Sequence, residues 1–264
     1  MGQIMTEASR RAAVVTGASQ GIGAAIAIRL ARDGYRVLMA ARSQDKLDGL
    51  RGTILAADGK AEVHAADLRR ADACTALIDQ AASSFGGLDL LVNCAGSTKS
   101  GDFFSLPEED FIDGFALKFH AAVNLTRAAW PHLVQSGNGH IVNIIGIGAR
   151  RPLADYTIGG PVNSALLSFT KAMADRGVTD GVRVNGINPG FIETDRVGVW
   201  LSRIAARDQV PEESARESLV REQRILRIGK PEEIAALVAF LDSPEAGYFH
   251  GAILDIDGGA IKCT

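Results

Sequence analysis

A glycine-rich segment near the N-terminal end of the chain has residue types that suit the binding of a diphosphate. It reads TGASQGIG over residues 16–23 and stands between an apolar run and a helical pattern. Gly17 allows a tight turn, Gly21 lets the backbone approach a diphosphate, and Gly23 permits close packing of a helix on a strand. Free N–H groups at the start of that helix would bind the anion. We predict a dinucleotide site at this turn, made by Gly17, Ser19, Gly21, Ile22 and Gly23.

A second short segment bears on which dinucleotide would bind. Residues 39–43 read MAARS at the end of a predicted strand. An acidic residue at this point binds the ribose 2′-hydroxyl of NAD, but Ala41 is not acidic. Arg42 follows it, and its guanidinium can bind a phosphate through two hydrogen bonds. We therefore predict NADP(H) as the cofactor. The alternative is that Arg42 is an ordinary surface arginine.

These segments belong to a regular alternation of short apolar runs and helical patterns. Apolar strands separated by helices predict a parallel sheet with helices on both faces. We expect one α/β domain over residues 1–264, with a Rossmann-type, doubly wound parallel sheet of about seven strands. The expected strands are Ala12–Thr16, Arg36–Ala40, Ala61–Ala66, Leu88–Asn93, His140–Ile145, Val182–Ile187 and Ala252–Asp255. The expected helices include Gly23–Asp33, Ala71–Phe85 and Glu232–Leu241.

One stretch departs from this alternation. Residues 195–227, from Asp195 to Arg227, follow the sixth predicted strand, are rich in arginine and glutamate, and have weak apolar periodicity. An insertion after the carboxyl end of a strand is typical of a lid over a ligand site. A solvated pair of surface helices is the alternative, and the sequence leaves both open.

Composition excludes two classes of partner. The chain has 264 residues, a formal net charge of −3 and no basic block that would neutralise a nucleic-acid backbone. No apolar run approaches the roughly 18–20 residues that span a bilayer. The first residues are polar and have no signal-peptide core. Gly2 and Thr6 match a myristoylation pattern, which we attribute to chance. We expect neither a nucleic-acid nor a membrane partner.

The cysteines bear on compartment and on metal binding. Cys74, Cys94 and Cys263 are far apart and lack the spacing of a metal site or of a CxxC motif. We interpret them as reduced thiols of a cytoplasmic protein. The five histidines are also scattered, and we expect no metal site.

Four later motifs, together with the glycine turn, resemble those of the short-chain dehydrogenase/reductase family. They are NCAG at 93–96, NPGFIET at 188–194, RIGKPEEI at 227–234 and DGG at 257–259. The resemblance runs from about Arg11 to Gly259. It implies further contacts with the cofactor, and among them Asp67 and Leu68 would contact the adenine. These implied residues are Asp67, Leu68, Asn93, Ala95, Gly96, Pro189, Gly190, Ile192 and Thr194.

The resemblance also shows where this chain departs from the catalytic pattern of the family. In that pattern a serine polarises the substrate carbonyl, a tyrosine transfers the proton, and a lysine four residues later lowers the pKa of the tyrosine. This chain has Gly146 at the serine position, Gly159 at the tyrosine position and Asn163 at the lysine position. Counting forward from Gly146 and back from the FTK segment at 169–171 gives the same alignment.

Two other residues could replace the missing groups. The family has an asparagine on a neighbouring helix where this chain has Lys118, so Lys118 and Asn163 look like an exchange of amine and amide between facing helices. Tyr156 lies three residues before Gly159 and could supply a phenol. We expect the helix to start near Pro161. The alternatives are a solvated lysine and a tyrosine that packs an edge. Apolar neighbours of Lys118 argue for a buried position.

We therefore expect an NADP(H)-dependent oxidoreductase that acts on a carbonyl/alcohol pair of a small molecule through a rearranged proton relay. One alternative is a nucleotide-binding protein without reductase activity, in a regulatory or structural role. Another is non-redox chemistry on the same scaffold, and the fold alone does not decide. The resemblance also implies a homo-oligomer, a tetramer, in which the helix from Phe103 to Trp130 and the helix from Ser164 to Met173 pair across a two-fold axis.

Overall fold

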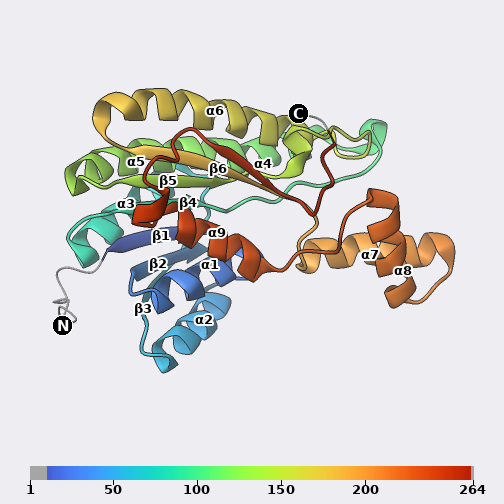
Figure 1. Ribbon diagram of the computed structural model, residues 1–264, viewed down its shortest axis with the longest axis horizontal. Helices are drawn as coiled ribbons and strands as arrows, with labels where there is room; N and C mark the ends of the chain where they lie inside the picture. Colours follow the sequence, from blue (N-terminus) through green and yellow to red (C-terminus); the bar gives the residue numbers. More distant parts are fainter. Residues whose placement is uncertain (1–10, 263–264) are drawn as a thin grey trace.

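The computed structural model describes residues 11–262, which contain a seven-stranded parallel sheet (Figure 1). Its strands are β1 (Ala12–Thr16), β2 (Arg36–Ala41), β3 (Lys60–Ala65), β4 (Leu90–Asn93), β5 (His140–Ile144), β6 (Arg183–Pro189) and β7 (Ile253–Ile256). Their order in the sheet is β3-β2-β1-β4-β5-β6-β7, so the winding direction reverses between β1 and β4. This order confirms the predicted doubly wound sheet. Gly2, Thr6 and Cys263 lie outside the described residues.

Helices cover both faces of the sheet. Those of one layer are α1 (Gly21–Arg32), α2 (Gln44–Ala56) and α9 (Pro231–Leu241), and those of the other are α3 (Ala71–Phe85), α5 (Ala121–Ser136) and α6 (Gly159–Asp180). Figure 1 shows α5 and α6 toward the top of the view and α1 and α2 toward the bottom. Every residue of β1, β4 and β5 is buried, because both faces of these strands meet helices. Two apolar cores, one on each face, fix the carboxyl ends of the strands.

The segment between β4 and β5 differs from the single helix expected from Phe103 to Trp130. It contains η2 (Phe103–Ser105), α4 (Glu108–Phe115), the π-helical turn η3 (Ala116–His120) and then α5. Pro107 directly precedes α4 and separates it from η2, because proline cannot donate a helical hydrogen bond. A π turn widens the helix by one residue and redirects the side chains in it. Lys118 lies in this turn.

Helix α6 begins at Gly159, two residues before Pro161, the expected starting point. The amide of Gly160 donates to the carbonyl of Tyr156 (3.0 Å), so helical hydrogen bonding starts at once. Pro161 then lies in the first turn, where its missing N–H breaks no helical hydrogen bond. Tyr156 therefore lies just before α6, and its carbonyl accepts a hydrogen bond from the first turn of that helix.

Two helices follow β6 and lie beyond the end of the sheet (Figure 1). These are α7 (Asp195–Asp208) and α8 (Glu212–Gln223), and they occupy the region with weak periodicity. They pack on each other through a small apolar cluster of their own. The cluster is centred on Val197, Leu201, Ile204, Ala215 and Leu219.

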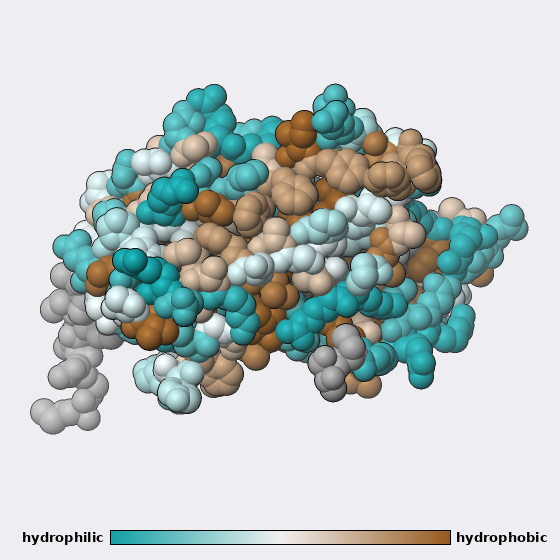
Figure 2. Space-filling model, turned by 90° about the horizontal axis from the view of Figure 1, so that it is seen from above, coloured by the Kyte–Doolittle hydropathy of each residue, from teal (hydrophilic) through white to brown (hydrophobic). Residues whose placement is uncertain are grey.

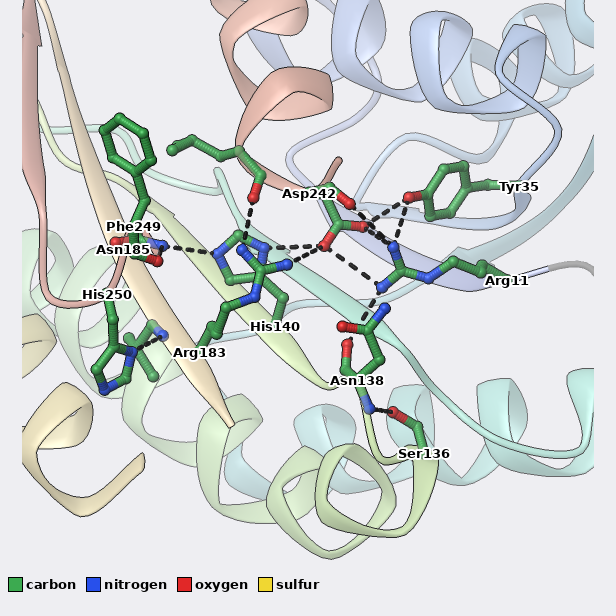
Figure 3. A network of polar contacts seen from close by, with 12 residues as sticks. Arg11, Tyr35, Ser136, Asn138, His140, Arg183, Asn185, Asp242, Phe249 and His250 are labelled. Carbon is green, nitrogen blue, oxygen red and sulfur yellow. Dashed lines mark hydrogen bonds and ion pairs between the residues drawn. The ribbon is translucent and has the colours of Figure 1, made fainter. Parts of the chain in front are cut away.

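A buried carboxylate ties together the opposite, amino-terminal edge of the sheet (Figure 3). Asp242 follows α9, and its side chain is inaccessible to solvent. One of its oxygens accepts from Tyr35 (2.6 Å) and pairs with Arg11 (2.8 Å). The other oxygen accepts from His140 (2.9 Å) and lies 3.4 Å from Arg183. The carboxylate therefore links residues at the starts of β1, β2, β5 and β6.

Candidate functional site

A cleft of about 1220 Å³ opens at the carboxyl ends of β1, β4, β5 and β6. It includes the point where the winding direction of the sheet reverses, the usual ligand site of such sheets. Of the residues predicted from sequence, Asp67 and Asn93 do not line it and all others do. Asn93 is buried and donates to Asn143 (2.9 Å). Asp67 is paired with Arg69, whose hydrogen bonds lower the pKa of that carboxyl.

The glycine turn is compact, and two of its positions tolerate no side chain. A Cβ on Gly23 would lie 2.3 Å from the carbonyl oxygen of Gly17, so only glycine lets α1 start this close to β1. Gly17 itself has φ +67, and a Cβ there would lie 2.9 Å from the Cα of Ala95. Gly21, Ile22 and Gly23, the first residues of α1, line the cleft, so their amides lie where an anion would bind.

Thr16 joins this turn to the end of the neighbouring strand. Its hydroxyl accepts from the amides of Cys94 and Ala95, each at 3.0 Å. These bonds hold the two sides of the cleft together where β1 and β4 end. Burial raises the pKa of the Cys94 thiol to about 12, so this thiol is protonated at neutral pH and is no nucleophile.

A chain of hydrogen bonds connects the glycine turn with α7. Lys46 donates to Gln20 (2.5 Å), and Gln20 donates to Asp195 (2.9 Å) at the start of α7. Arg42 lines the same part of the cleft beside Lys46 and Ser43. Two positive side chains, Arg42 and Lys46, thus stand beside the turn where a phosphate would bind.

Lys118 reaches into the cleft from the π-helical turn η3. Its amine donates to the carbonyl of Ile145, just past the end of β5, and its methylene stem packs against Gly96. Burial lowers the pKa of Lys118 to about 7, and the positive charge of Arg196 adds to the effect. An amine of this kind exchanges a proton at neutral pH.

Asn163 comes from the first turns of α6 and meets the same strand end. It is 2% exposed, and a Cβ on either Gly146 or Gly148 would lie 3.1 Å from its Nδ2. Gly146 has φ +129, a conformation that other residues rarely adopt. Within residues 11–262, Oδ1 of Asn163 has no hydrogen-bond partner. Lys118 and Asn163 therefore approach adjacent residues, Ile145 and Gly146, from two helices.

The ring of Tyr156 lies directly over Gly159. A Cβ on Gly159 would be 1.9 Å from Cζ of this ring, so the ring fills the space that a side chain at 159 would need. The phenol oxygen is 3.2 Å from the hydroxyl of Thr98 and accepts from Arg196 at 3.3 Å. Because Gly159 has no side chain, the ring of Tyr156 can occupy this position.

Three further arginines line the cleft, and they were not among the residues predicted from sequence. Arg196 and Arg203 come from α7, and Arg151 follows β5 in the loop before α6. Arg203 donates to the hydroxyl of Ser100 (3.1 Å). The signal that could have found the pair on α7 is their separation by seven residues, which places both on one face of a helix.

A metal site and a membrane-spanning helix each require features that the described part of the chain does not have. No three histidine, cysteine or acidic side chains among residues 11–262 are grouped so that they could hold a metal ion. None of the helices described is both long and apolar enough to cross a membrane.

The fold and the cleft define a Rossmann-type α/β protein with its ligand site at the topological switch point. Residues 17–260 match the family model described as enoyl-(acyl carrier protein) reductase. The chain belongs to the short-chain dehydrogenase/reductase family and is one of its oxidoreductases.

Several relatives with a stated activity match over nearly the full length of the chain. The chain is 35% identical to the short-chain reductase NovJ of Streptomyces niveus, over 94% of this chain and 92% of that protein. It is 32% identical to the NADPH-dependent reductase BacG of Bacillus subtilis, over 96% and 99%. The crystal structure of L-sorbose reductase from Gluconobacter frateurii, with NADPH and L-sorbose, superposes with a TM-score of 0.92, at 31% identity and over 97% and 98%.

Proposed function

We propose that this protein reduces a substrate carbonyl with NADPH, and that Lys118, Tyr156 and Asn163 form a rearranged proton relay. The observation that carries this proposal is the position of Tyr156, whose ring occupies the space over Gly159. A phenol is thereby supplied to the cleft from a residue three positions earlier in the sequence. In the family pattern the phenol would come from residue 159 itself.

The residues present fit a nicotinamide dinucleotide. The glycine turn exposes the first amides of α1, and Oδ1 of Asn163 is a buried acceptor in the same cleft that a ribose hydroxyl would satisfy. Arg42 would bind the 2′-phosphate of NADP(H). The NADPH relatives support this preference. When bound, NADPH supplies a hydride to the carbonyl carbon.

The protein's own residues supply the proton and balance the charge. The phenol of Tyr156 donates its proton to the carbonyl oxygen as the hydride reaches the carbon, and an alcohol results. Arg196, 3.3 Å from the phenol oxygen, stabilises the phenolate that remains. Lys118 lines the same cleft, and its protonated amine would restore the phenol, since its pKa of about 7 allows proton transfer near neutrality. Asn163 orients the ribose.

We further propose that residues 1–264 form one domain in which residues 195–227, including α7 and α8, act as a lid. The support is that the first two residues of α7 contact two parts of the cleft lining. Asp195 accepts from Gln20 in the glycine turn, and Arg196 donates to Tyr156. The free thiols of Cys74 and Cys94 are consistent with a cytoplasmic location.

A homo-oligomer is proposed on the exposed apolar surface of η2 and α4. Phe103, Phe104 and Ile112 are 52%, 90% and 60% exposed. Figure 2 looks onto the side of the molecule that carries α6 and shows apolar side chains over part of it. Isologous contacts between copies would cover such a surface, and we propose a tetramer. Light scattering at micromolar concentration tests this, and a monomeric mass would reject it.

The reductase proposal is tested with a panel of carbonyl compounds and NADPH, followed by the loss of NADPH absorbance, beside a calorimetric titration with NADPH and NADH. We expect turnover of at least one class of carbonyl compound and tighter binding of NADPH. Binding without turnover across the panel would favour a nucleotide-binding protein that lacks reductase activity.

A further inference from the structure

Arg196 and Arg203 of α7 line the cleft, and neither has an acidic partner among residues 11–262. We propose that the substrate is an oxo acid whose carboxylate lies next to the reacting carbonyl, and that Arg196 and Arg203 bind this carboxylate. The inference rests on the proposed reduction at Tyr156 and narrows its substrate to 2-oxo and 3-oxo acids.

The geometry of α7 brings both guanidinium groups to the cleft. Arg196, Val199, Trp200 and Arg203 all line it, at intervals of three, four and seven residues that fall on one helix face. Val199 and Trp200 lie between the two arginines along this face. Their apolar surface would exclude water from a bound carboxylate and strengthen its contacts with the arginines.

Other arginines of the same region show the pairing that is missing here. Arg207, at the far end of α7, binds Asp208 (2.7 Å) and Glu222 (2.5 Å). By contrast, the hydrogen bonds of Arg196 and Arg203 go to neutral hydroxyl oxygens, on Tyr156 and Ser100. Within residues 11–262 neither forms a salt bridge.

The third cleft arginine adds an unsatisfied donor. Nη1 of Arg151 is buried, and no atom in the described part of the chain accepts a hydrogen bond from it. Arg151 lines the same cleft as the two arginines of α7. A buried guanidinium nitrogen without an acceptor is costly, and an anionic ligand removes that cost.

Carboxylates that line the cleft do not neutralise these arginines. Glu193 is bound by Arg216 (2.8 Å), and Asp195 accepts from Gln20 (2.9 Å). The third, Glu232, lies in the first turn of α9. The arginines of the cleft therefore keep a net positive charge that a substrate can meet.

The distance between Arg196 and Tyr156 limits how far the carboxylate of the substrate can be from its reacting carbonyl. Nη1 of Arg196 is 3.3 Å from the phenol oxygen that would protonate the carbonyl. A ligand that contacts both groups has its carboxylate and its carbonyl one or two bonds apart. This spacing is that of 2-oxo and 3-oxo acids, and a distant carboxylate would not reach both groups.

A comparison of acids with their esters tests the proposal in turnover. 2-Oxobutanoate and acetoacetate are compared with their methyl esters under NADPH. We expect a kcat/KM at least about tenfold higher for an acid than for its ester, the usual effect of a charge-assisted hydrogen bond. Arg196→Gln should abolish this preference and Arg207→Gln should keep it. Equal rates for acid and ester, or a preference that survives Arg196→Gln combined with Arg203→Gln, would overturn the oxo-acid proposal and leave the reductase function standing.

A binding experiment separates the two proposals, because it needs no turnover. The NADP⁺-saturated protein is titrated in a calorimeter with oxamate, which carries a carboxylate beside a carbonyl, and with neutral oxamide. We expect oxamate alone to bind, and Arg196→Gln to weaken it about tenfold or more. No oxamate binding, or equal binding of oxamide, would overturn the anion site. Oxamate binding without reduction of any carbonyl compound would overturn the reductase function instead.

Discussion

At the amino-terminal edge of the sheet, Asp242 is buried and both of its oxygens accept hydrogen bonds from side chains around them (Figure 3). At the carboxyl-terminal edge, Asn163 is also buried, but its carbonyl oxygen has no partner within residues 11–262. Nη1 of Arg151 is likewise buried and has no hydrogen-bond partner within these residues. Nε of Arg11 also has no partner within residues 11–262, so what distinguishes Asn163 and Arg151 is that they line the cleft. Satisfied polar groups hold strands together, whereas unsatisfied ones in a cleft mark where a ligand completes the hydrogen bonding.

The largest effect should come from Tyr156→Phe, which removes the proposed proton donor. We expect kcat for carbonyl reduction to fall by about 10²- to 10⁴-fold, the usual contribution of a general acid. Calorimetric binding of NADPH should change little, because the ring that covers Gly159 remains. A variant that keeps most of its turnover would show that the phenol is a packing group and not the proton donor.

The next effect is structural and concerns the carboxylate of Asp242 at the amino-terminal edge. Asp242→Ala leaves Arg11 and Arg183 beside a buried gap without their counter-charge. We expect a loss of about 3–5 kcal/mol in the free energy of unfolding by urea, as for other broken buried ion pairs. Asp33→Ala is the control, because it breaks the partly exposed pair with Arg29, and it should cost less than about 1 kcal/mol. Equal losses would mean that the buried network is not what holds this edge.

Cofactor selection gives a smaller effect at the cleft. Arg42→Ala should weaken NADPH binding more than tenfold, since a charge-assisted hydrogen bond contributes about 1.5–3 kcal/mol. NADH binding should change little, because NADH has no 2′-phosphate. Calorimetric titration of both dinucleotides measures this, and a variant that binds both as the parent does would assign Arg42 to the solvated surface.

Lys118 should give the reaction a dependence on pH near neutrality. Its folded pKa of about 7 lies below the ordinary 10.5, so the amine loses its proton as pH rises through 7, and the rate of reduction should fall there. The free energy of unfolding should instead rise as pH increases from 7 to 10.5, because in this range the unfolded chain binds more protons than the folded one. Lys118→Met should lower the rate and flatten the profile. Lys99→Met is the control, since Lys99 pairs with Asp110 (2.7 Å), and a profile unchanged in Lys118→Met would remove the amine from the relay.

The contrast between the two edges also separates what the sequence could predict from what it could not. The glycine turn was predictable because its requirements are local: a sharp turn and close packing of one helix. The network of Asp242 joins residues up to 231 positions apart, and no local pattern indicates it. The resemblance to the family placed Lys118 and Asn163 near one another, but the direction of Lys118 depends on a π turn.

Tyr156 and the arginines of α7 show a second limit of sequence reasoning. The ring of Tyr156 reaches the cleft only because Gly159 leaves space for it, and that is a contact between a turn and a helix. The segment of α7 was predicted as a lid or as a solvated helix pair. The spacing of Arg196 and Arg203 indicates that they share one face of a helix. The sequence alone does not show that this face lines the cleft.

The smallest effect on stability should come from Asn163 in the cleft, and it is the most direct test of the contrast with Asp242. Asn163→Leu replaces a buried amide by an apolar side chain of similar size, and its oxygen has no partner to lose within residues 11–262. We therefore expect the free energy of unfolding to change by less than about 1 kcal/mol, or to rise, because the cost of an unsatisfied acceptor disappears. Binding of NADPH, by contrast, should weaken, because the ribose loses its acceptor. A urea melt of the free protein measures the first quantity and calorimetry the second. A loss of stability as large as that of Asp242→Ala would show that Asn163 supports the fold, and the unsatisfied oxygen would then not mark a ligand site.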